Sequence, residues 1–277
     1  MAEVSAEARA EAADSEDSAA EMPAVAARVA AGESAAREGI DMEGKLSELI
    51  KRAQAAFGDR LVSALLYGSA ASGDWHEQSS DLNVLFVLDT LTPRELAQSE
   101  PVVRWWREQG NPPPLLLTEI EVQTSTDCFP MEFHDMQEHR RVLYGKDAIE
   151  GLQIDRSFYR AQVEHELRAK QIRLRQRAAE VLSNSDRLTQ LMVDSISTFC
   201  VLGRHALILS GNEPRWKKAE IVAALETVLK MHMSAANEIL AIRASAKRST
   251  QMDTLSLFEA YLNETDALVR FVDRLDR

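Results

Sequence analysis

The chain has 277 residues, of which 45% are hydrophobic, and a formal net charge of −12 at pH 7. Of its 44 acidic residues, 11 lie in the first 44 positions, so the remainder is only mildly acidic and is unlike a nucleic-acid coat protein. No apolar run approaches the roughly 20 residues that a membrane span requires, and the acidic N-terminus lacks the features of a secretory signal. We therefore expect a cytoplasmic protein with no membrane partner.

Residues 1–41 are rich in Ala, Glu and Ser, and the first 40 contain no aromatic residue. Ala and Glu favour helix locally, but the segment has too little large apolar surface to hold a persistent structure. We predict a disordered acidic tail, which is either a solvated extension or a segment that binds a partner.

The pattern changes at Met42, where apolar residues begin to recur at helical spacing. This spacing predicts a helix that ends near Gly58 and buries Leu46, Leu49, Ile50, Ala53 and Phe57. Two apolar runs follow, at residues 61–68 and 82–88, and both are typical of buried strands.

The next segment alternates between helix and strand signals. A Thr-Pro start and a Glu three residues after the Thr predict a helix from about residue 92, interrupted near Pro101. Residues 115–122 predict a short strand followed by a turn of helix. Residues 128–136 are interpreted as a fourth strand, in which Pro130 marks an edge or a bulge.

Beyond residue 148 the pattern is helical to the end. Helices are predicted over about 155–183, 186–210, from Pro214 onward, 229–246 and 252–275. The predicted fold class is therefore α/β (α+β). Its parts are a small mixed-sheet domain over residues 42–148 and an all-α helical bundle over residues 149–277.

The residues between the first two predicted strands carry the chemistry. Because strand residues alternate between faces, Asp81 and Asn83 should point the same way while Leu82 points into the core. Gly68 and Ser69 lie at the end of the preceding strand, where a glycine lets a phosphate approach the backbone closely. Oxygen ligands beside a phosphate-binding turn are typical of magnesium-dependent phosphoryl or nucleotidyl transfer.

This arrangement resembles the DNA polymerase β-type nucleotidyltransferase superfamily, whose signature is an apolar strand, Gly-Ser, a loop of about ten residues and Asp-x-Asp on the next strand. The stretch "LLYGSAASGDWHEQSSDLNVLFVL" matches it at Gly68, Ser69 and Asp81. The helical C-terminal half is similar in layout to the bundle of aminoglycoside adenylyltransferases. The resemblance implies a nucleotide-binding site at Gly68 and Ser69, with Mg²⁺ (or Mn²⁺) and an NTP substrate.

The resemblance also implies a third carboxylate on a later strand. Glu132 is the residue that we assign to this role, with Asp127 and Asp135 as substitutes. The implied catalytic and metal-binding set is then Asp81, Asn83 and Glu132.

Asn83 departs from the family pattern, which has a second Asp at this position. An amide oxygen can still bind a cation, but it brings no charge. Three outcomes are open: the site holds one metal firmly, Asp74 or Glu77 supplies the missing charge, or the domain binds nucleotide without turning it over.

We therefore expect transfer of a nucleoside monophosphate, AMP from ATP, to a small-molecule, RNA or protein acceptor. The alternative is a non-catalytic domain that senses nucleotide or binds a partner. The acceptor and the oligomeric state are left open by the sequence.

The remaining reactive side chains are interpreted as structural. The six histidines lack the spacing of paired zinc ligands, and both cysteines, Cys128 and Cys200, have the apolar neighbours of small buried residues. Basic side chains over residues 168–177 bind an anion or form a solvated ion-paired face. Trp216 with its following lysines binds an anion or is a surface cluster.

Overall fold

The structure is a computed structural model that describes residues 42–72, 81–245 and 253–275, without the side chains of Ser69, Ser72 and Ser245. The predicted tail at residues 1–41 lies outside the described residues. So do Asp74 and Glu77, the two candidates for the missing charge.

The described part contains a four-stranded mixed sheet in the order β3-β2-β1-β4. Its strands are β1 (Leu61–Tyr67), β2 (Asn83–Leu88), β3 (Leu115–Thr118) and β4 (Arg140–Gly145). Strand β1 is antiparallel to both β2 and β4, whereas β2 and β3 run parallel. The two central strands are the two apolar runs of the sequence, and they are buried on both faces as predicted.

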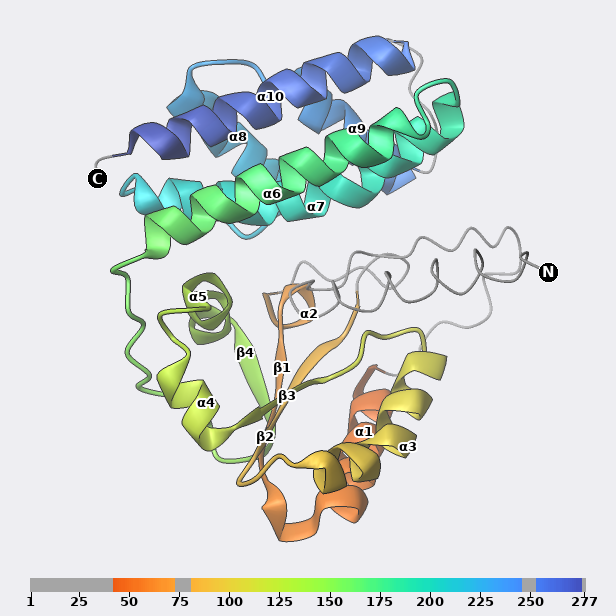
Figure 1. Ribbon diagram of the computed structural model, residues 1–277, viewed down its shortest axis with the longest axis vertical. Coiled ribbons are helices and arrows are strands. Elements are labelled where there is room, and N and C mark those ends of the chain that lie inside the picture. Colours follow the sequence, from red (N-terminus) through yellow and green to blue (C-terminus); the bar gives the residue numbers. More distant parts are fainter. Residues whose placement is uncertain (1–41, 73–80, 246–252, 276–277) are drawn as a thin grey trace, which may run out of the picture.

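Helices cover both faces of the sheet (Figure 1). On one face, α1 (Met42–Phe57) and α3 (Pro93–Glu108) pack on one set of alternating residues of β1 and β2. On the other face, α4 (Glu119–Thr124) and α5 (Pro130–Glu138) pack on the intervening set. A short 3₁₀ helix, Gly58–Arg60, joins α1 to β1.

Two predictions about this part are wrong. Residues 130–138 form helix α5 and not a strand, because Pro130 occupies its first turn, where a missing amide proton costs nothing. The fourth strand is the following segment, β4. Helix α3 also continues through Pro101, which is exposed; the helix begins with the predicted capping box of Thr92 and Glu95, and it buries Trp106.

The C-terminal half is a bundle of helices with one buried apolar cluster. Its members are α6 (Tyr159–Ala179), α7 (Ser185–Leu209), α8 (Lys218–Leu229), α9 (Ser234–Ser245) and α10 (Thr254–Arg274). A mixed-sheet α/β part followed by an all-α part is the predicted fold class, which is confirmed. The boundary between residues 148 and 149 stays a prediction.

Among the described helices, α7 has a length and composition that would allow it to cross a membrane. In the bundle, 56% of the most apolar 18-residue stretch of α7 is buried. Such burial is typical of a core helix in a globular protein. The absence of a membrane partner therefore stays a prediction.

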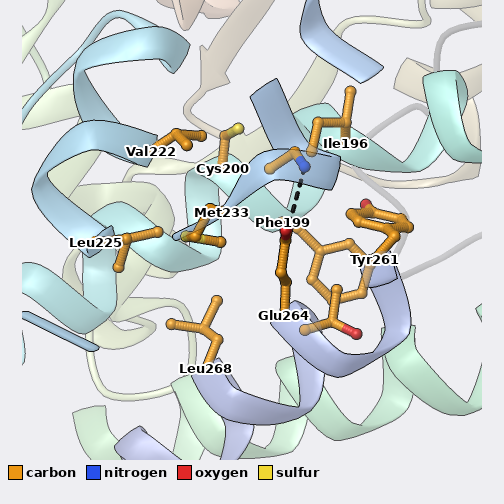
Figure 2. Close-up of a pocket in the computed structure, with 11 residues that line it drawn as sticks. Ile196, Phe199, Cys200, Val222, Leu225, Met233, Tyr261, Glu264 and Leu268 are labelled. Atoms are coloured by element: carbon orange, nitrogen blue, oxygen red, sulfur yellow. Dashed lines mark hydrogen bonds between the residues drawn. The ribbon is translucent and has the colours of Figure 1, made fainter. Parts of the chain in front are cut away.

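A buried carboxylate connects α10 to α9 beside a small pocket of apolar side chains (Figure 2). Both oxygens of Glu264 accept hydrogen bonds of 2.8 Å, from the backbone amides of Ala235 and Ala236 in the first turn of α9. These bonds favour the ionised form. Burial outweighs them, and with a smaller contribution from Glu226 it raises the pKa of Glu264 to about 7.

Replacing Glu264 by Gln removes this titration. The folded chain keeps the proton up to about pH 7, whereas the unfolded chain releases it near the ordinary value of 4.5. The contribution of Glu264 to the free energy of unfolding therefore falls as the pH rises through this window, by as much as about 3 kcal/mol relative to Glu264→Gln. Urea unfolding of both proteins at pH 4.5 to 8 measures this difference, and a constant difference would contradict the assignment.

Candidate functional site

The glycine that follows β1 lies beside the asparagine that begins β2. Tyr67 and Asn83 are paired across the two strands, and Gly68 follows with a φ of +77°. A Cβ added at Gly68 would lie 3.1 Å from Nδ2 of Asn83. A side chain at position 68 would therefore meet both an unfavourable backbone conformation and a close neighbour.

The chain enters a short helix, α2 (Ser69–Ser72), directly after Gly68, and the amide of Ala71 donates to the Gly68 carbonyl at 3.0 Å. The side chain of Ser69, which the sequence assigns to nucleotide binding, is not described. In Figure 1, α2 and the end of β1 that leads into it lie at the border between the sheet and the helical half.

Asp81 precedes β2 in a half-buried position. Leu82, next to it, is in the core with Val84, as the alternation predicts, and its amide donates to Oδ1 of Asn111 at 3.2 Å. Burial raises the pKa of the Asp81 carboxyl, and the positive charge of Arg243 on α9 partly offsets this. The helical half thus contributes a cation to the surroundings of Asp81.

Glu132 lies on helix α5 and not on a strand, which corrects the predicted position of the third carboxylate. Strands β3 and β4 carry no acidic residue. Burial raises the pKa of Glu132, and the charges of Asp135 and Glu166 add to the effect. The Tyr67 hydroxyl has a pKa raised by burial and by the charge of Glu132, so Glu132 is near the last residue of β1.

The two substitute carboxylates have other partners. Asp135 binds Arg204 of α7, and Asp127 raises the pKa of the neighbouring Cys128 thiol by a hydrogen bond. Cys128 is exposed, contrary to the prediction, whereas Cys200 is buried as predicted.

The basic side chains of α6 form an ion-paired face along part of its length. Arg168 binds Glu164 at 2.8 Å, and Lys170 lies 3.9 Å from Glu166. Trp216 is held between side chains: the Arg204 guanidinium lies 4.2 Å from its ring centre and the His139 ring 4.0 Å from it. Both observations favour the structural interpretation of these residues.

Several site residues were not predicted from the sequence. Arg243, Glu166 and Asn111 come from segments far from the motif, and only the packing brings them near it. Tyr67 directly precedes Gly68 and shares a face with Asn83, so strand alternation could have identified it.

Replacing Gly68 by Ala should destabilise the protein more than the same change at Gly58. Both glycines have a left-handed φ, so each substitution costs about 1 kcal/mol or more in backbone strain. Nothing lies within 4 Å of a Cβ at Gly58, whereas one at Gly68 presses on Asn83.

Chemical unfolding of Gly68→Ala, Gly58→Ala and Gly68→Ala combined with Asn83→Ala measures this excess. We expect the double variant to recover the part of the loss that is due to the contact. Equal losses at positions 68 and 58 would contradict the described contact.

No protein-family model matches the chain, and no curated protein sequence matches it. Among solved structures, the chain is similar to a spectinomycin adenyltransferase from Enterococcus faecialis, crystallised with ATP and spectinomycin, with a TM-score of 0.54 and 13% identity. The match covers 83% of this chain and 99% of that chain. At this identity the likeness establishes a shared fold, and that fold agrees with the one that the Gly68 to Asp81 motif predicts.

Proposed function

We propose that the protein is a nucleotidyltransferase that transfers AMP from ATP to a small acceptor molecule. One observation carries the proposal: the side chain of Asn83, at the start of β2, lies where a Cβ at Gly68 would crowd it, and Asp81 is two residues before Asn83. The similar solved structure, an adenyltransferase bound to ATP, supports the choice of nucleotide.

The strand end would hold the triphosphate. The backbone around Gly68, which is half-buried, would lie against the phosphates together with Ser69 at the start of α2, because a glycine without a Cβ permits close approach. A bulky side chain at position 68 would close this approach and displace Asn83.

The oxygens of Asp81, Asn83 and Glu132 would hold Mg²⁺, or Mn²⁺ in its place. These donors suit a hard cation, and burial raises the pKa of both carboxyl groups, so a bound cation would offset their desolvation. When bound, the metal neutralises negative charge on the phosphates.

The transfer would proceed by attack of an acceptor hydroxyl oxygen on the α-phosphorus of ATP. The bond from this phosphorus to the bridging oxygen of the β-phosphate breaks, and pyrophosphate leaves. Glu132 would take the proton of the hydroxyl as a general base.

The acidic surroundings favour a small neutral or cationic acceptor over RNA. The negative charge of Glu166 on α6 acts on Glu132. The carboxylates of Asp194 on α7 and of Asp81 are both near the positive charge of Arg243. An RNA acceptor would bring many phosphate charges to these carboxylates in addition to those of ATP. The similar adenyltransferase was crystallised with spectinomycin, a small molecule.

Asn83 favours a second candidate function, nucleotide sensing without turnover. An amide in place of a carboxylate removes one negative charge from the metal site, which weakens the binding of a second divalent ion. In this case ATP would bind and change the contact between the sheet and the helical half, without release of pyrophosphate.

Thermal unfolding in the presence of ATP and Mg²⁺ tests the binding site. At a nucleotide concentration of about 100 times the dissociation constant, the folded state should gain about 2.7 kcal/mol. Asp81→Asn should abolish this gain. Asp89→Asn is the matched control, because Asp89 is exposed beyond the opposite end of the same strand. Absence of any metal-dependent shift in the wild type would exclude both functions.

Pyrophosphate release separates the two functions. A transferase releases pyrophosphate when ATP, Mg²⁺ and a panel of hydroxyl-bearing acceptors are supplied, and Asn83→Asp should increase the rate by strengthening metal binding. If only Asn83→Asp releases pyrophosphate, the natural protein is the sensor. Release by the wild type that is unchanged in Asp81→Asn would contradict the assigned site.

A further inference from the structure

We propose that His134, Asp135 and His205 form a second metal site, which binds a transition-metal ion such as Zn²⁺ and joins helix α5 to helix α7. One potential ligand atom from each of these residues lies within 4.8 Å of the others. The site shares no residue with the set assigned to Mg²⁺, and histidine spacing along the sequence does not reveal it.

The three side chains converge from two halves of the molecule. His134 and Asp135 are neighbours on α5, which packs on the sheet, and His205 is fully buried on α7 in the bundle. The rings of His134 and His205 meet edge to face, with centres 6.0 Å apart. Atoms bound to zinc lie about 2.0–2.2 Å from it, so a small closure of these side chains completes a ligand set.

The polar atoms that face this space lack hydrogen-bond partners among the described residues. They are Nδ1 of His134, Oδ1 of Asp135 and Nε2 of His205. The first two lie 3.7 Å apart, and the third lies 3.5 Å from Oδ2 of Asp135. Buried polar atoms without partners are destabilising, so three that face one another indicate a bound group.

Neighbouring side chains orient two of the ligands. The Tyr159 hydroxyl lies 2.6 Å from Nδ1 of His205. With Nδ1–H donating to the Tyr159 oxygen, Nε2 has the free lone pair that would bind the ion, and it is directed at Asp135. The Arg204 guanidinium donates to Oδ2 of Asp135, which leaves Oδ1 available. Hydrogen bonds of this kind support the ligands of known metal sites.

The charges at the site favour a transition metal over magnesium or calcium. Arg204 already neutralises the carboxylate of Asp135, so the attraction for a hard divalent ion is weak. Two imidazole nitrogens and one carboxylate oxygen suit Zn²⁺ or Co²⁺, whose bonds to neutral imidazole do not require a charged ligand. The ion would hold α5 against the bundle and would thereby fix the position of Glu132, which is on the same helix.

Co²⁺ binding tests the proposal directly. The full-length protein is stripped with a chelator and titrated with Co²⁺, whose visible absorption depends on ligand number and type. We expect one Co²⁺ per chain with the intense bands of a four- or five-coordinate nitrogen-containing site. His134→Gln should abolish the bands. His165→Gln should keep them, because His165 is exposed on α6 outside the site.

Two further measurements distinguish loss of this metal site from misfolding and from loss of the proposed nucleotide site. Asp81→Asn should keep the bands while losing stabilisation by ATP and Mg²⁺, so the two proposals fail independently. If circular dichroism shows that His134→Gln does not fold, X-ray absorption of the zinc-loaded wild type replaces it and should show two imidazole ligands. Absence of Co²⁺ binding, bands retained in folded His134→Gln, or zinc without imidazole ligands would overturn the proposal.

Discussion

The candidate site depends on the position of the Asn83 side chain, which lies where a Cβ at Gly68 would crowd it. This arrangement exists because β1 and β2 are antiparallel neighbours that pair Tyr67 with Asn83, so the end of one strand and the start of the next share one edge of the sheet. A left-handed glycine lets the chain leave β1 without a side chain at this edge. The positions proposed for the phosphates and for the oxygens of Asp81 and Asn83 therefore depend on a single strand pairing.

Helix α5 links this edge to the helical half. One of its faces packs on the sheet, and Met131 belongs to the buried cluster of the bundle. Although burial alone would raise the pKa of Asp135, His205, His134 and Arg204 together hold it well below its usual range. The buried carboxylate is thus ionised and attached to α7. Glu132, on the same helix, is positioned by contacts that lie outside the proposed nucleotide site.

The part of the fold governed by local patterns could be predicted from the sequence. Continuous apolar runs predicted β1 and β2, alternation between strand faces predicted the direction of Leu82, and the helical pattern predicted the bundle helices that the structure describes. Residues 130–138 were misassigned because a short apolar stretch with a proline is compatible with an edge strand and with a helix start. For the candidate site, the sequence indicated only residues that are close to one another along the chain. Arg243 and His205 reach their partners through tertiary packing, and the local pattern of one sequence does not reveal such packing.

The central claim is that the edge formed by Gly68, Asp81 and Asn83 binds a metal-complexed triphosphate. A crystal structure with Mn²⁺ and a non-hydrolysable ATP analogue tests it most directly, because the anomalous signal of manganese locates the ion. The account predicts an ion coordinated by the Asp81 carboxylate, with the phosphates against the backbone of Gly68. A nucleotide bound elsewhere, or manganese without contact to Asp81, would contradict it.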